Sequence, residues 1–179
     1  MSRRAAPPEE PQLDVVDRAR PRTPRPFLAR VVRAALAHGG RPAMPVALLL
    51  TGDREIGRLH AEFLGDPSPT DVISFAVDDG AEIVVSVDTA RRVARQKGHA
   101  ARAEVALYVV HGLLHVMGWD DVRPRLREQM RAAEAAIMRS LGLAYAPVDV
   151  AAAARKPKPK PKPTPPPRRR AAPKRRSPS

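Results

Sequence analysis

The stretch DVISFAVDDGAEIVVSV, residues 71–87, decides the fold class. Two apolar runs rich in β-branched residues flank Asp79-Gly80, a dipeptide that is typical of the tight turn in a β-hairpin. The pattern predicts a strand over residues 71–77 and a returning strand over residues 82–87. This hairpin lies between regions of helical periodicity, so the chain combines paired strands with helices.

Helical spacing of apolar residues recurs on both sides of the hairpin. Upstream it runs from Phe27 to Leu36, directly after a proline that suits the first turn of a helix. Downstream, residues 101–117 are strongly apolar and residues 125–141 are amphipathic, and a glycine ends each helix. The other expected elements are strands over 12–16 and 46–51, a helix capped by Asp53, and a basic helix that is capped by Asp88 and ends near Gly98. Together they favour an α+β fold with a small mixed β-sheet packed with helices.

The positive charge is concentrated at the C-terminal end of the chain. Of the formal net charge of +13, residues 151–179 contribute eleven Lys and Arg and no acid, so the remaining residues are nearly neutral. Lysine and proline alternate there without any large apolar residue, a composition that cannot build a core. We expect a disordered N-terminus over residues 1–11, one domain over 12–147, and a disordered Lys/Pro/Arg-rich tail over 148–179. Such a polycation is expected to associate with RNA.

Composition also limits which cellular compartment the protein can occupy and which kinds of disulfide or metal site it can form. The chain has no cysteine, which excludes disulfides and thiolate metal ligands. No apolar segment follows the basic N-terminal residues, and the longest apolar run, residues 46–50, is too short to span a bilayer. We therefore expect a cytoplasmic protein with no membrane partner.

The run HGLLHVMGWDD, residues 111–121, carries the candidate chemistry. Histidines four residues apart share one helix face at a separation of about 6 Å, so His111 and His115 can reach one cation. Gly118 then ends the helix, and Asp121 can bring a carboxylate to the same ion, although Asp120 remains an alternative. Three protein ligands and an open position are typical of catalytic zinc, whose bound water has a pKa near 7.

Two other interpretations of this run compete with a catalytic metal. A bare His-x-x-x-His pair is more often two packing histidines, but the Gly-Trp-Asp-Asp turn that follows favours a metal. Zinc peptidases with similar histidine spacing need a glutamate directly after the first histidine, and here that residue is Gly112. Glu104 lies about 10 Å away along the helix, too far to replace it. Proteolysis is disfavoured on that ground.

These residues resemble the signature H-G-x-L-H-x-x-G-Y-D-H of the YbeY family of bacterial rRNA maturation endoribonucleases. A second block, FLGDPSPTDVISF at residues 63–75, is similar to the family's Y-R-x-K-D-x-P-T-D-V-L-S-F. The resemblance covers roughly residues 12–145 and implies an α+β fold with a zincin-like metal-binding helix. It implies one Zn²⁺ held by His111, His115 and the residue at 121, where the family has a histidine and this chain has Asp121.

The same resemblance implies zinc-dependent cleavage of single-stranded RNA, in late-stage 16S rRNA maturation and ribosome quality control. The expected partners are precursor rRNA and the small ribosomal subunit. On this interpretation His111 and His115 act in catalysis through the zinc-bound water. The alternative functions are a catalytically impaired RNA- or ribosome-binding protein of the same fold and, third, a zinc peptidase.

Two departures from the family pattern bear on the chemistry, Asp121 at the third ligand position and Leu64. Leu64 stands where the family has an arginine near the phosphate, and phosphodiester cleavage needs positive charge at the developing phosphorane. Arg91, Arg92 or Arg95 on the next helix are candidates to supply it, the alternative for each being a solvated helix face. Thr70 and Asp71 are candidate substrate contacts, although a turn bonded to local backbone at the start of a strand would use the same residues.

Overall fold

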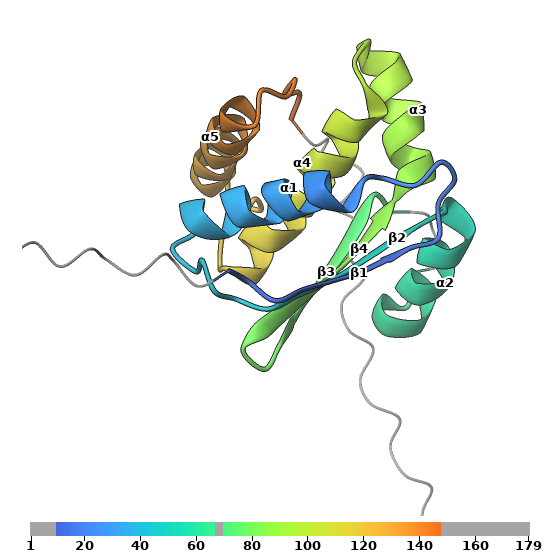
Figure 1. Cartoon of the computed structure of the whole chain (residues 1–179), viewed down its shortest axis with the longest axis horizontal. Helices are drawn as coiled ribbons and strands as arrows, with labels where there is room; N and C mark the ends of the chain where they lie inside the picture. The colour runs from blue at the N-terminus through green and yellow to red at the C-terminus, as the bar shows by residue number, and fades with distance from the viewer. Residues whose placement is uncertain (1–9, 67–69, 148–179) are drawn as a thin grey trace, which may run out of the picture.

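The computed structural model describes residues 10–66 and 70–147, in which a four-stranded mixed sheet forms the centre of the molecule (Figure 1). The strand order is β1-β2-β4-β3; the first three pair in parallel and β3 runs antiparallel to β4. The bounds are β1 Leu13–Asp17, β2 Val46–Thr51, β3 Val72–Val77 and β4 Gly80–Ser86. The predicted α+β class and mixed sheet are thereby confirmed.

The hairpin predicted from residues 71–87 is present as β3 and β4. Its register pairs Val77 with Gly80 next to the turn and Val72 with Val85 at the far end. Asp78 adopts a φ of 38°, in the positive range that such tight turns require. The returning strand begins two residues earlier and ends one residue earlier than the pattern indicated.

Helices cover the two faces of the sheet unequally (Figure 1). The helices are α1 Arg25–His38, α2 Asp53–Leu64, α3 Val87–Lys97, α4 Ala101–Val116 and α5 Pro124–Ser140. On one face, α1, α4 and α5 enclose the main core together with the inward side chains of the strands. On the other face, α2 packs a smaller cluster around Ile56, Ile73 and Val84.

Helix α4 lies at the centre of the main core. Every residue from Ala103 to Leu114 is buried, which explains why the sequence of this helix is apolar on all sides. It packs against α1, α3, α5 and the β3–β4 hairpin. A chemical group on α4 is therefore held by several elements at once. None of the helices in the described part of the chain combines the length and apolarity needed to cross a membrane.

The predictions that Asp53 caps α2 and Asp88 caps α3 are wrong. The N-cap residues are Gly52 and Ser86, and each aspartate instead bonds to the start of the other helix. α3 begins after Ser86, whose hydroxyl oxygen accepts from the Thr89 N–H at 3.1 Å. The Asp53 carboxylate accepts from the Thr89 hydroxyl at 2.7 Å and from the Ser86 hydroxyl, both at the start of α3. Asp88 in turn accepts from the backbone N–H of Asp53 at 3.2 Å. Each aspartate thus contacts the neighbouring helix.

The predictions for the chain ends lie mostly outside the described residues. Residues 1–9 and 148–179, which include the whole basic tail, are not among them. The described part begins just before β1 and ends at Pro147, after α5.

The contact between α2 and α3 leads to a first prediction. Burial raises the pKa of Asp53, but hydrogen bonds from Ser86, Thr89 and Arg92 outweigh it and lower the pKa overall. Because the pKa of Asp53 is lower in the folded than in the unfolded chain, the ionised carboxylate stabilises the fold at pH values above about 4, the ordinary pKa of aspartate. Asp53→Asn should therefore reduce the free energy of unfolding at neutral pH by about 1–2 kcal/mol.

The difference from wild type should shrink as the pH falls through the lowered pKa of Asp53, where the wild-type carboxylate also becomes neutral. Urea denaturation across a pH series measures this. Glu62→Gln, on an exposed position of the same helix, is the matched control and should change stability little. A deficit for Asp53→Asn that stays constant down to about pH 2 would contradict the electrostatic explanation.

Candidate metal centre

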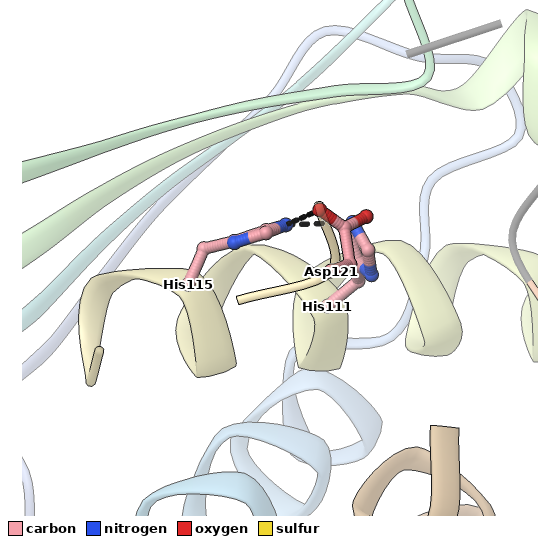
Figure 2. Close-up of side chains that lie close together, drawn as sticks. All are labelled: His111, His115 and Asp121. Carbon is pink, nitrogen blue, oxygen red and sulfur yellow. Dashed lines mark hydrogen bonds and ion pairs between the residues drawn. The ribbon is translucent and has the colours of Figure 1, made fainter. Parts of the chain in front are cut away.

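Helix α4 places His111 and His115 one turn apart on the same face. Their ring centroids are 4.5 Å apart with planes at 87°, and the two Nε2 atoms approach to 3.1 Å. Figure 2 shows both side chains with Asp121 beside them. His111 is buried at 5% exposure, whereas His115 keeps about a quarter of its side chain exposed. The pair therefore opens to solvent on the His115 side.

Asp121 reaches this pair through the turn that ends α4. Gly118 adopts a φ of 93° there, a conformation that favours glycine, and the chain folds back. The Asp121 carboxylate oxygens then lie 3.9 Å from Nε2 of His111 and 3.8 Å from Nε2 of His115. Asp120 instead accepts from the Val122 N–H at 2.9 Å within its own turn. Of the two adjacent aspartates, Asp121 joins the histidines.

Hydrogen bonds at the other ring nitrogens determine which nitrogen of each histidine carries a proton. Nδ1 of His111 lies 2.7 Å from a carboxylate oxygen of Glu134, and Nδ1 of His115 lies 3.1 Å from the Trp119 backbone carbonyl. A carbonyl and an ionised carboxylate can only accept, so each Nδ1 donates its proton. Both Nε2 atoms therefore face each other and, in the neutral form of each ring, can offer a lone pair to a cation.

Three possible metal-binding atoms thus converge, one from each residue. The ligand atoms of His111, His115 and Asp121 all lie within 4.8 Å of one another. For zinc bonds of about 2.0–2.1 Å, neighbouring ligand atoms of a tetrahedron are about 3.3 Å apart, close to the distances found here. These residues fit a small divalent cation, which the two Nε2 atoms and the carboxylate could share.

Glu134 and the Trp119 carbonyl contact the two histidines, and the sequence pattern indicated neither contact. The Trp119 side chain packs against the main core, which holds its carbonyl toward His115. Glu134 lies on α5, 1% exposed, among the apolar residues that α5 turns inward. An acid inside the apolar stripe of an amphipathic helix is a signal that could have identified it. No comparable signal points to Tyr145, which donates to Glu134 at 2.9 Å.

Gly112 faces the sheet and not the metal ligands. A Cβ at this position would lie 3.2 Å from side-chain atoms of Ile83 and Val72. The residue directly after the first histidine therefore points into the packing between α4 and the hairpin. The chain thus has glycine where a zinc peptidase has its glutamate base, in line with the preference against proteolysis.

Thr70 and Asp71 lie at the start of β3, and Val72 beside them meets α4 near Gly112. The Asp71 carboxylate accepts from the Val72 N–H at 2.9 Å and from the Thr70 hydroxyl at 3.2 Å. These are the local bonds expected of a turn that leads into a strand. The packing of β3 on α4 brings this turn near the helix that carries His111 and His115, and contact of Thr70 and Asp71 with substrate stays a prediction.

The arginines of α3 differ in what they contact. Arg91 donates to the backbone carbonyl of Arg20 at 2.7 Å, and so it ties α3 to the loop after β1. Arg95 is exposed near the end of α3. Leu64 is also exposed, at the end of α2 and on the sheet face opposite α4. A role for Arg91 or Arg95 toward RNA stays a prediction.

The different contacts of the two aspartates lead to a second prediction. Asp121→Ala should weaken the binding of divalent metal by about tenfold or more, because the variant lacks one of the three ligands. Asp120→Ala is the matched control and should have a clearly smaller effect, since its carboxylate bonds within the turn. Competition of each variant with a chromophoric zinc chelator measures the two affinities. The reverse ranking would transfer the ligand role to Asp120.

Known proteins are similar to most of this chain. The family model described as Endoribonuclease YbeY matches residues 22–142. A protein named Endoribonuclease YbeY from Heliobacterium modesticaldum is 35% identical over 137 residues, covering 65% of this chain and 82% of that protein. One of the same name from Anaeromyxobacter is 40% identical over 120 residues, covering 63% of this chain and 62% of that protein.

A solved structure shares the fold. The solution structure of a Thermotoga maritima protein superposes with a TM-score of 0.53 at 20% identity, covering 72% of this chain and 91% of that one. At this identity the likeness supports the fold alone. The family match, by contrast, spans the sheet from β2 onward, the metal helix and α5. The chain therefore belongs to the YbeY family.

Proposed function

We propose that this protein is a zinc-dependent, single-strand-specific endoribonuclease of the cytoplasm, with its metal on His111, His115 and Asp121. The observation that carries the proposal is the convergence of two imidazole nitrogens and a carboxylate, with Nδ1 of each histidine beside a hydrogen-bond acceptor. Relatives of this chain are named endoribonucleases, which indicates RNA as the substrate.

The ligand types favour zinc over other divalent ions. Two imidazoles and one carboxylate, with separations near those of a tetrahedron, suit zinc, whereas magnesium and calcium prefer sets made of oxygen. When bound, such an ion supplies Lewis acidity, polarising a phosphoryl oxygen and making water more acidic. The exposed side of His115 leaves room for a phosphodiester to approach.

The residues of the chain have distinct roles in this proposal. His111 and His115 hold the ion by Nε2, and Asp121 adds a negative charge that makes it a weaker Lewis acid than three histidines would. Thr70 and Asp71, beside the metal helix, are proposed to contact the RNA strand. Among the α3 arginines we favour Arg95 over Arg91 for charge at the phosphate, because Arg91 already contacts the Arg20 carbonyl.

The proposed biological role is late-stage 16S rRNA maturation and ribosome quality control on the small subunit. Its support is family membership together with the polycationic tail, whose eleven Lys and Arg suit a large RNA partner. The second candidate is a binding protein of the same fold that no longer cleaves RNA. Leu64 favours it, since an apolar side chain cannot stabilise a phosphorane.

The third prediction tests cleavage directly. Zinc-loaded wild type should cut a single-stranded precursor of 16S rRNA and leave the same sequence in duplex form intact. His111→Ala should reduce cleavage by a factor of about a hundred or more while keeping its circular dichroism spectrum. Wild type that binds zinc and RNA but cuts neither substrate would identify the non-cleaving binding protein. Hydrolysis of a peptide substrate would support the peptidase.

The fourth prediction separates the tail from the chemistry. Truncation after Ala154 removes all eleven cations of the tail and no residue of the metal centre. The truncated protein should bind single-stranded RNA more weakly, with a logarithmic salt slope shallower by about 0.7 for each phosphate that the tail no longer neutralises. Single-turnover cleavage at saturating RNA should change little. An unchanged slope would exclude the tail from RNA binding, and a collapsed rate would give it a catalytic role.

A further inference from the structure

We propose that Glu134 and Tyr145 are positioning residues that fix His111 as a metal ligand and connect the site to the segment just before the tail. The inference rests on the metal site proposed above and deepens it. Neither residue belongs to the group of metal ligands, and each acts through its neighbour.

The first step concerns the carboxylate of Glu134, in which each oxygen has a hydrogen-bond partner. Oε1 accepts from Nδ1 of His111 at 2.7 Å, and Oε2 accepts from the Tyr145 hydroxyl at 2.9 Å. With 1% of Glu134 exposed, water does not compete for either oxygen. Burial and the nearby negative charge of Glu134 raise the pKa of Tyr145, so the hydroxyl stays a donor. The carboxylate is therefore held in one orientation.

The second step is the charge of the centre. Two neutral histidines with the carboxylates of Asp121 and Glu134 carry two negative charges, which balance a divalent cation. In a largely buried site an unbalanced charge would be costly. Glu134 thus contributes twice, by fixing the His111 tautomer and by supplying half of the compensating charge. Partners of this kind commonly change metal affinity by about ten- to a hundredfold.

The third step concerns the position of Tyr145, which lies in the segment between α5 and the tail. Lys97 of α3 donates to the carbonyls of Ala146 at 3.3 Å and Pro147 at 3.2 Å. Lys97 also pairs at 3.3 Å with Glu104, a fully buried residue of the metal helix. The segment is thus bonded to α5 through Tyr145 and to α3 and α4 through Lys97. The last described residues before the tail are part of the support of the metal centre.

Three variants test the proposal, with zinc affinity and the His111 tautomer as readouts. Glu134→Gln keeps the shape but can present either its oxygen or its amide to His111, so it no longer fixes the tautomer. Tyr145→Phe removes one hydroxyl and keeps the charge. Glu128→Gln, at an exposed position of the same helix, is the control for loss of a carboxylate. Chelator competition gives the affinity, and ¹⁵N NMR of the metal-free protein gives the tautomer.

We expect Glu134→Gln to lower zinc affinity by about ten- to a hundredfold and to give a mixture of His111 tautomers. Tyr145→Phe should lower the affinity by less, in the same direction, and Glu128→Gln should match wild type. If wild type and Glu134→Gln bind zinc equally well, this inference is overturned and the proposed function is left intact. Wild type that binds no zinc would instead overturn the proposed function.

If Glu134→Gln does not fold, Tyr145→Phe decides the question, because it alters no charge and removes a single hydrogen bond. Unchanged zinc affinity together with an unchanged His111 ¹⁵N spectrum in that variant would overturn the positioning chain. If Tyr145 had only a structural role, Tyr145→Phe would lower the free energy of unfolding but leave the zinc affinity and the His111 ¹⁵N spectrum unchanged.

Discussion

The packing of α4 against the β3–β4 hairpin is the contact on which the metal centre depends. At Gly112 the helix approaches the strands so closely that even a methyl group would lie 3.2 Å from Ile83 and Val72. This fixes the rotation of the helix about its own axis. With Gly112 directed at the sheet, His111 lies about 100° around the helix and His115 about 60°, so the pair faces out beside this contact, where the turn after Gly118 can bring a carboxylate. The glycine of the motif therefore serves packing, and its neighbours serve chemistry.

Much of this arrangement could be predicted from local pattern. The hairpin follows from the Asp-Gly turn between β-branched runs, and the buried helix from an apolar run that is too long for a strand. The spacing of His111, His115 and Asp121 is sufficient to propose a shared ion, because one helix and one tight turn determine where those residues lie. Local periodicity succeeds when a single element controls the geometry.

The parts that could not be predicted depend on contacts between elements. Asp53 looks like a cap for its own helix, yet its carboxylate bonds to residues at the start of α3, and no local pattern reveals which helix end receives it. Glu134 lies 23 residues from His111 in sequence, and Tyr145 lies beyond the end of α5. Each of these outcomes was decided by tertiary contacts that sequence periodicity does not encode.

The replacement of a third histidine by Asp121 gives the centre a different electrostatic balance from the family pattern. With Glu134 beside His111, the residues of the proposed centre would bring a charge of −2 to the ion, which would favour tight binding and reduce its acidity. The most direct test of this centre is X-ray absorption at the zinc edge of the loaded protein. It should give one zinc per chain, nitrogen and oxygen ligands at about 2.0–2.1 Å, and outer scattering from two imidazoles. A spectrum without imidazole scattering, or zinc bound below one equivalent, would contradict the assignment of His111 and His115 as ligands.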